Sequence, residues 1–504
     1  MLATPRVTAP LRALAWRRAV AFHTLVLLAA LPWLWARTPG PSSNVVPLLV
    51  SWACVAAFAA VAVGRACNWR GVRRAIVLAW LVAALTSSAI GLMQWFGVAH
   101  ALPFVSPAEA GVAYGNLRQR NQFATLTSLG LLALLWMAGS RRWPPAWLYL
   151  AAALLACANA VSSSRTGFVQ LLLVAALAGG WAGPRRPRLL VAGCALVAYG
   201  LASQLLPAVF FAWHGGWPPT AFERMGLDLG CSSRKVLWAN VLHLISLRPW
   251  QGWGLGELAY AHYATLYAGP RFCEILDNAH NLPLHIAVEL GVPVAAAACG
   301  ALAWILLRAR PWRARRPHHQ LAWTAVLVIG VHSLLEYPLW YGPFQVALLA
   351  SVVLLAVRRW NPVRLRWAVR GAAVLVLAAA AFVQGEYQRV TQPYLPPEQR
   401  WPRMRVDPVG TAGRMVLFDE QLHFAELGVM QLSPANAARM HELALEMLHY
   451  SPEPPVIEKV IESALMLGRD DTALWHAQRY RAAFPEDYRR WLSRNAQPVE
   501  LPRP

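Results

Sequence analysis

The short polar segment Asp277–Asn281 carries the residues with the clearest potential for acid–base chemistry. It places His280 beside one carboxylate and two amides, and it runs directly into an apolar stretch that starts at Leu282. A neutral imidazole in such surroundings can accept the proton of an attacking hydroxyl, so His280 is our candidate general base. The alternative is a structural histidine whose ring is hydrogen-bonded to the backbone. The position where an apolar span meets water favours the catalytic interpretation.

Two arginines are candidates for binding a diphosphate. Arg165 follows the run Ser162–Ser164 at the mouth of a predicted helix, and Arg234 opens a predicted amphipathic helix. Arg165 could instead reach the lipid headgroups, and Arg234 could be a solvated surface charge. Two guanidinium groups beside one outer cleft could grip a diphosphate with bidentate hydrogen bonds.

A further polar pair lies within an apolar region. His332 and Glu336 are four residues apart and would share one helix face. They either line a cavity close to His280 or join two helices. His280 and His285 are five residues apart and do not share a helix face, and no D-x-D pair lies outside the C-terminal part, so we expect metal-independent chemistry. We also expect no cofactor.

The composition is that of a membrane protein with many spans. Hydrophobic residues make up 57% of the chain and charged residues only 14%, which excludes a soluble globule. The net charge of +22 comes from arginines in short clusters between apolar runs, so it indicates topology and not nucleic-acid binding. About eleven apolar segments are long enough to be spans, at residues 19–36, 45–63, 75–98, 121–139, 145–161, 166–182, 189–206, 282–307, 320–337, 343–357 and 368–384.

The arginines also predict the orientation of these spans. With a cytoplasmic N-terminus, the arginine-rich loops all face the cytoplasm, and the short loops opposite hold only Arg37, Arg118, Arg120 and Arg165. The first apolar run has no small-residue cleavage site, so we expect it to be kept as a span. The large loop 207–281 and the C-terminal part then face the periplasm of a bacterial inner membrane.

Two domains are predicted. Residues 1–384 form an all-α polytopic membrane domain that includes the loop 207–281, and residues 385–504 form a soluble periplasmic domain of tetratricopeptide-like helix pairs. Within the loop, the apolar face from Val236 to Ile245 marks an amphipathic helix that we expect to rest on the bilayer. Cys231 and Cys273 either pair in the oxidising periplasm or stay free.

Five segments, taken together and in order, resemble the O-antigen ligase and Wzy polymerase superfamily, most closely the bacterial O-linked oligosaccharyltransferases that glycosylate pilin. They are Gly115–Ala124, Ser163–Gly167, Pro249–Gly256, Asn278–Asn281 and His332–Pro338. The resemblance implies a fold related to the multi-span lipid-sugar glycosyltransferases. It also implies extra helices or a re-entrant loop near 207–250.

The resemblance further implies a metal-independent transferase that moves a glycan from undecaprenyl diphosphate to an acceptor hydroxyl on the periplasmic face. His280 matches the essential histidine of the family, Arg165 matches its arginine in the serine-rich segment, and Arg234 matches the arginine of its outer-loop helix. The other residues that we assign to substrate binding are Asn121, Gln170, Asn281, Glu336 and Tyr337. The implied partners are the lipid-linked glycan, a pilin-like acceptor protein and membrane lipids.

Two rival functions stay open. An O-antigen ligase or polymerase would differ only in using a lipid or glycan acceptor. A lipid-sugar transporter would need paired repeats and broken helices in both halves, and the sequence shows no such symmetry. We expect the C-terminal domain to bind or orient the acceptor protein and not to touch the lipid diphosphate, because its charge is close to neutral and it has no arginine cluster.

Overall fold

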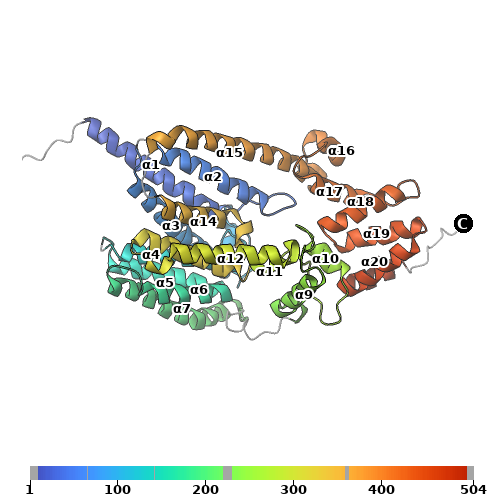
Figure 1. The fold of residues 1–504 in the computed structure, drawn as a ribbon, viewed down its shortest axis with the longest axis horizontal. Coiled ribbons are helices and arrows are strands. Elements are labelled where there is room, and N and C mark those ends of the chain that lie inside the picture. Colours follow the sequence, from blue (N-terminus) through green and yellow to red (C-terminus); the bar gives the residue numbers. More distant parts are fainter. Residues whose placement is uncertain (1–8, 65, 141, 219–229, 358–361, 496–504) are drawn as a thin grey trace, which may run out of the picture. The chain divides into compact units, whose positions relative to one another are not determined.

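The computed structural model describes residues 9–64, 66–140, 142–218, 230–357 and 362–495, and all regular structure in these ranges is helical (Figure 1). Residues 219–229 of the predicted outer loop and 496–504 of the predicted C-terminal domain lie outside them. The chain separates into two compact units, 1–227 with 309–384 and 228–308 with 385–504. Seven of the described helices are long and apolar enough to cross a bilayer, as expected of a multi-span membrane protein.

The first unit contains most of the apolar helices. They are α1 (Ala9–Leu34), α2 (Val45–Ala62), α3 (Trp69–Trp95), α4 (Arg120–Ala138), α5 (Pro145–Val161), α6 (Arg165–Ala178), α7 (Arg185–His214), α13 (Pro317–Ser333), α14 (Gly342–Ala356) and the part of α15 (Pro362–Thr391) up to Gln384. Three of them, α5, α6 and α14, are apolar but shorter than a typical span. The eleven predicted segments all fall on helices, and the number that cross the membrane stays a prediction.

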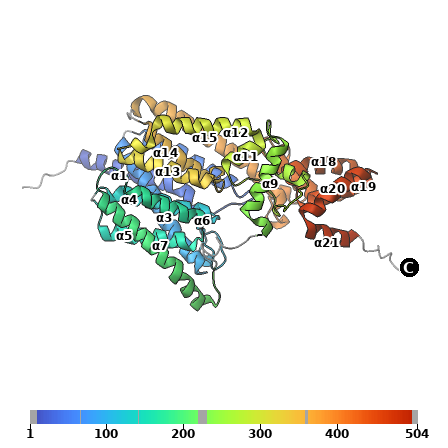
Figure 2. The same cartoon turned by 60° about the horizontal axis from the view of Figure 1, so that its bottom comes forward.

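Helix α4 lies at the centre of this unit. It packs against α3, α5, α6 and α13, and its residues Leu126, Leu129 and Leu132 are fully buried. In Figure 2, α4, α5 and α7 run side by side, as their contacts require. A side chain at Gly167 would collide with Ala124, so glycine allows the start of α6 to approach α4 closely.

Helix α7 is longer than the sequence suggests. It continues through Pro207 because the residues that follow are still apolar, and it ends at Gly215, whose φ of 74° gives a left-handed C-cap. The first residues of the predicted loop 207–281 are therefore helical.

The predicted span 282–307 is wrong as a single helix. It consists of α11 (Leu282–Leu290) and α12 (Val292–Ala309), which meet at Gly291. Gly291 has φ 89° and ψ 160°, a conformation that ends a helix and strongly favours glycine. Hydrophobic periodicity alone does not reveal such a break.

The second unit combines α9 (Arg234–Leu247), α10 (Leu258–Ala264), α11 and α12 with the C-terminal helices. The apolar face predicted from Val236 to Ile245 is confirmed as part of α9. Its role is different from the prediction, because Leu237, Val241 and Leu244 are buried in a core shared with α10 and α11. This face therefore packs against protein and not against lipid.

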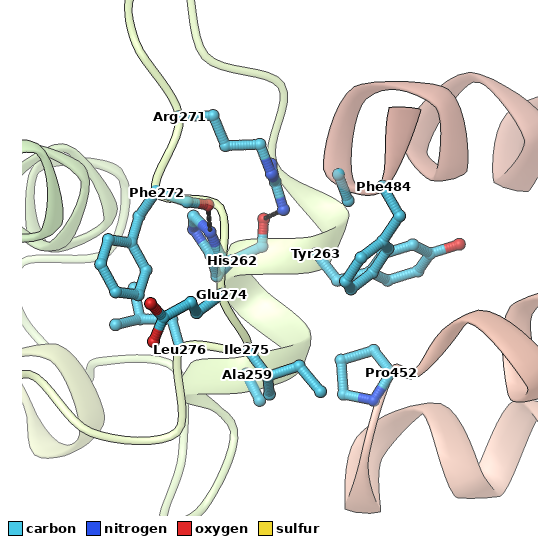
Figure 3. Close-up of a pocket in the computed structure, with 11 residues that line it drawn as sticks. Ala259, His262, Tyr263, Arg271, Phe272, Glu274, Ile275, Leu276, Pro452 and Phe484 are labelled. Atoms are coloured by element: carbon cyan, nitrogen blue, oxygen red, sulfur yellow. Dashed lines mark hydrogen bonds between the residues drawn. The ribbon is translucent and has the colours of Figure 1, made fainter. Parts of the chain in front are cut away.

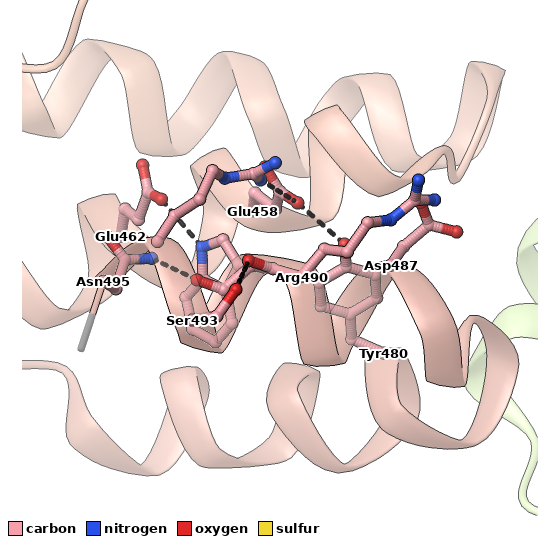
Figure 4. A network of polar contacts seen from close by, with 9 residues as sticks. Glu458, Glu462, Tyr480, Asp487, Arg490, Ser493 and Asn495 are labelled. Carbon is pink, nitrogen blue, oxygen red and sulfur yellow. Dashed lines mark hydrogen bonds and ion pairs between the residues drawn. The ribbon is translucent and has the colours of Figure 1, made fainter. Parts of the chain in front are cut away.

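The C-terminal helices are α16 (Pro408–Ala412), α17 (Asp419–Val429), α18 (Ala437–Tyr450), α19 (Pro454–Met466), α20 (Asp470–Ala483) and α21 (Pro485–Asn495). Helices α18, α19 and α20 pack side by side (Figures 1 and 2). The predicted face of α19 is buried at Ile457, Val460 and Ile461, whereas Leu465 is exposed. Polar contacts join successive helices, such as the bond from the Tyr480 hydroxyl to Glu458 at 2.7 Å (Figure 4). The likeness to tetratricopeptide repeats stays a prediction.

Candidate functional site

His280 is held in an uncommon backbone conformation. Its φ is 50°, in the left-handed region, and its backbone N–H donates to the side-chain oxygen of Asn278 at 2.9 Å. Asn281 caps the N-terminus of α11 by accepting from the backbone N–H of Leu284 at 3.1 Å. The imidazole is half-buried. A non-glycine residue held in this region marks a position where the surrounding structure dictates the geometry.

Several contacts fix residues 265–281, which we call the His280 loop. Cys273 forms a disulfide with Cys231, with a Cα–Cα distance of 5.4 Å, which decides the alternative left open by the sequence. The indole N–H of Trp238 donates to the carbonyl of Ala279 at 3.0 Å. The Asn240 amide bonds Pro270 O at 3.0 Å and Phe272 N at 2.8 Å.

Sequence reasoning missed Trp238 and Asn240 as residues that hold the His280 loop in place. Both point from α9 towards backbone groups of a distant segment, so no local motif marks them. Asn240 is buried in the middle of an otherwise apolar face of α9. Because a buried side-chain amide needs hydrogen-bond partners, its place on this face is the sequence feature that could have identified it.

Arg234 lies in the same compact unit as His280. It is the first residue of α9, after the N-cap Ser233, whose hydroxyl accepts from Val236 N at 3.4 Å. Asp277 precedes His280 by three residues. Desolvation raises the pKa of its carboxyl and the charge of His280 opposes the rise, although water weakens both effects because Asp277 is exposed.

The glycine-rich segment Pro249–Gly256 stabilises the junction after α11. Trp253 N donates to Val288 O at 2.9 Å and Gly254 N donates to Glu289 O at 3.0 Å. A side chain on Gly252 would collide with the backbone of Glu289. Gly252 therefore allows close backbone packing against the C-terminal end of α11, the helix whose N-terminus follows His280.

The first unit holds a second group of predicted site residues. The Asn121 amide donates to a Glu336 carboxylate oxygen at 2.9 Å, and its carbonyl oxygen accepts from the Ser164 hydroxyl at 2.6 Å. Arg165, the next residue, is the first of α6 and is half-buried. The structure thus brings Asn121, Glu336 and the start of the Arg165 helix together. Tyr337 stacks its ring on Tyr341 at 5.9 Å.

A second set of side-chain hydrogen bonds lies one helical turn further along α4. Thr125, four residues after Asn121, bonds His332 Nδ1 at 2.9 Å and Gln170 Oε1 at 3.0 Å. Glu336 N donates to His332 O at 2.8 Å, so the predicted common face persists just beyond the end of α13. Gln170 also donates to Val328 O at 3.0 Å and is fully buried. To bind substrate, Gln170 would have to exchange these partners.

Among the residues that the structure describes, no three His, Cys, Asp or Glu side chains converge in a way that could hold a metal ion. His285 instead pairs with Glu289 at 3.5 Å, one turn along α11. Metal-independent chemistry stays a prediction.

Comparison with known proteins gives three family matches that follow one another along the chain. Residues 113–138 match a family described as protein glycosylation ligase, and residues 150–299 match one described as O-antigen ligase. Residues 320–497 match the C-terminal part of a family described as virulence factor membrane-bound polymerase.

A curated relative is similar over part of its length. It is a general O-oligosaccharyltransferase of Acinetobacter baylyi, 24% identical over 270 residues. The aligned region covers 52% of this chain and 46% of the relative, so the match spans about half of each protein.

Proposed function

We propose that the chain, which matches families described as O-antigen ligase and as protein glycosylation ligase, transfers a glycan from undecaprenyl diphosphate to Ser or Thr hydroxyls of exported proteins such as pilin. The observation that carries the choice of a protein acceptor is the protein glycosylation ligase match at residues 113–138. That segment supplies Asn121 and Thr125, the two α4 residues that contact Glu336 and His332. The Acinetobacter baylyi relative, whose name describes an O-oligosaccharyltransferase, supports the same choice.

In the proposed reaction, the acceptor oxygen attacks the anomeric carbon of the lipid-linked glycan. The new glycosidic C–O bond forms as the bond from that carbon to the diphosphate oxygen breaks, and undecaprenyl diphosphate leaves with the bonding pair. His280 takes the proton of the hydroxyl as general base. The negative charge of the leaving diphosphate is stabilised by Arg165 and Arg234, whose planar guanidinium groups suit bidentate contacts.

The remaining assigned residues would position the substrates. Asn281 fixes the start of α11 immediately after His280. Asn121 and Glu336, already hydrogen-bonded to each other, present polar atoms close to Ser164. Gln170 and Tyr337 complete the proposed binding set. No cofactor takes part in this scheme.

We infer a periplasmic location for the chemistry. The arginine pattern of the loops supports a cytoplasmic N-terminus. The Cys231–Cys273 disulfide supports an oxidising compartment for the outer loop, because such bonds persist in the periplasm and are rare in the cytosol. We retain the division into a membrane domain, 1–384, and a periplasmic helical domain, 385–504, as part of this proposal.

A second function has its own support. The matches described as O-antigen ligase and as membrane-bound polymerase favour a lipid or glycan acceptor. The reaction at the donor would be unchanged, and only the group that presents the hydroxyl would differ. A transporter has no such support from the comparisons.

Co-expression separates the two. Cells that make an undecaprenyl diphosphate-linked oligosaccharide receive this chain together with either a pilin or a lipopolysaccharide core acceptor. We expect a mass increase on the pilin equal to the oligosaccharide and an unchanged lipopolysaccharide. Glycan appearing on lipopolysaccharide alone, with unmodified pilin, would establish the ligase function in its place.

A further inference from the structure

Helix α10 lies between the core that supports the His280 loop and the C-terminal helices, all within the second unit. Its residues Leu258 and Ala261 are buried in the core shared with α9 and α11. Tyr263 is buried in a different core, formed mainly by α18, α19 and α20. Positions three apart share a helix face, so opposite faces of this short helix serve two cores.

Four contacts join α10 and its preceding turn to the C-terminal helices. The Tyr263 hydroxyl bonds His476 Nδ1 at 2.8 Å. Arg479 Nε donates to the carbonyl of Ala264 at 2.8 Å. At the exposed edge, Glu257 pairs with His449 at 2.7 Å, and the Tyr260 and His449 rings stack at 3.9 Å.

The opposite side of α10 is hydrogen-bonded to the His280 loop. Arg271 donates to the carbonyls of His262 and Thr265, each at 2.8 Å. The two ring nitrogens of His262 bond the Tyr267 hydroxyl at 2.8 Å and Phe272 O at 3.0 Å. The same loop contains Cys273, which forms the disulfide, and Ala279, whose carbonyl accepts the hydrogen bond from Trp238. Ala279 immediately precedes His280.

The space between α10 and the C-terminal helices is almost filled. A cavity of about 10 Å³ is lined by His262, Arg271 and Glu274 on one side and by Pro452 and Phe484 on the other (Figure 3). That volume holds about one water molecule and excludes a sugar or a peptide side chain. The contact between α10 and the C-terminal helices is therefore closely packed, and it is not a binding site for substrate.

We propose that the C-terminal helical domain is a positioning element of the active site, acting through Tyr263 and Arg479 on the loop that carries His280. The proposal rests on the proposed function of His280 and goes beyond an acceptor-binding role for this domain. A domain that only captured the acceptor would affect acceptor affinity. A domain that positions His280 also sets the rate of the chemical step, because small misplacements of a catalytic group lower kcat strongly.

The test uses a matched pair of buried tyrosines in one core. Tyr263 and Tyr480 are 2% and 0% exposed, and each hydroxyl bonds one side chain, His476 for Tyr263 and Glu458 for Tyr480. Only Tyr263 belongs to α10. The Tyr263→Phe, Arg479→Ala double variant removes the bond to His476 and the bond to the Ala264 carbonyl, whereas Tyr480→Phe removes a comparable bond inside the C-terminal domain.

The purified full chain is assayed with an undecaprenyl diphosphate-linked oligosaccharide and a pilin acceptor. We expect the double variant to lose roughly ten-fold to hundred-fold in kcat, with an acceptor KM close to that of the parent. Tyr480→Phe should keep kcat within about two-fold, and Arg479→Lys, which retains a positively charged hydrogen-bond donor group, should keep more activity than Arg479→Ala. An unchanged kcat in the double variant, or a change in acceptor KM alone, would overturn the proposal.

Two controls keep the result interpretable. If the double variant does not accumulate, the exposed pair is changed instead with Glu257→Gln and His449→Ala, and the same kcat and KM criteria apply. Inactivity of His280→Ala is established first. A fully active His280→Ala variant would contradict the proposed function of His280 itself. An inactive His280→Ala variant together with a fully active double variant would contradict only the present inference.

Discussion

Replacing Gly252 by alanine should destabilise the second unit far more than replacing Gly256. Both glycines have a left-handed backbone, with φ 70° and φ 78°. A Cβ on Gly252 would lie 2.7 Å from the backbone nitrogen of Leu290 and would also collide with the carbonyl of Glu289, whereas a Cβ on Gly256 meets open space. The two variants therefore share the cost of the backbone conformation and differ in the collision.

The expected magnitudes follow from these two terms. A left-handed alanine costs about 1–2 kcal/mol, which is the whole expected effect of Gly256→Ala. Overpacking against a rigid backbone adds about 1–3 kcal/mol, so Gly252→Ala should cost about 2–5 kcal/mol. It should also disturb the bonds from Trp253 N to Val288 O and from Gly254 N to Glu289 O.

The assay is thermal unfolding of the purified chain in detergent, followed by tryptophan fluorescence. We expect a clearly lower midpoint for Gly252→Ala than for Gly256→Ala, together with lower transferase activity. Equal midpoints for the two variants would refute the idea that close packing of the glycine segment against the end of α11 is what requires glycine at position 252.

Three further predictions concern pH, the disulfide and the arginines. Burial, with smaller contributions from the charges of Arg271 and Arg479, lowers the pKa of His262 to about 3 and that of His476 to about 4, from 6.5. Below pH 6.5 both imidazoles take up a proton when the chain unfolds, so the free energy of unfolding should be highest above that pH and should fall as the pH drops towards 4. A His476→Gln variant should show a smaller fall in the unfolding midpoint than the parent over the same pH range. Replacing Cys231 and Cys273 by serine should cost about 2–4 kcal/mol of stability, and thiol labelling of the unreduced parent should leave both unmodified. Arg165→Ala and Arg234→Ala should raise the KM for the lipid-linked donor, and lysine at either position should restore it only in part; equal activity of the lysine and arginine forms would argue against bidentate binding.

The helical class and most helix positions could be predicted because membrane spans need long apolar runs. Hydrophobicity could not place the break at Gly291, since residues on both sides are equally apolar and a single backbone conformation ends the helix. It also could not tell whether the apolar face of α9 meets lipid or protein. Leu237, Val241 and Leu244 suit either environment, and the choice depends on α10 and α11, which are distant in the sequence.

The candidate site was predictable where the signal was local. The His280 segment and the Cys231–Cys273 pair could be named from residue type and position. Glu336 was named from its spacing with His332 inside an apolar region, whereas Asn121, which bonds Glu336 across more than two hundred residues, was named only through the family resemblance. Tyr263 and Arg479 were missed, because a tyrosine and an arginine on amphipathic helices look like ordinary interface residues until their partners are known.

Transfer by His280→Ala, compared with His243→Ala, tests the central claim most directly. His243 is an exposed histidine of α9 in the same unit, so it controls for loss of an imidazole without loss of the proposed base. Each variant is co-expressed with a lipid-linked glycan pathway and a pilin. The amount of the variant in the membrane is measured, and the mass of the pilin is determined by mass spectrometry. We predict an unmodified pilin with His280→Ala at a normal protein level and full modification with His243→Ala. A fully glycosylated pilin in the presence of His280→Ala would contradict the account.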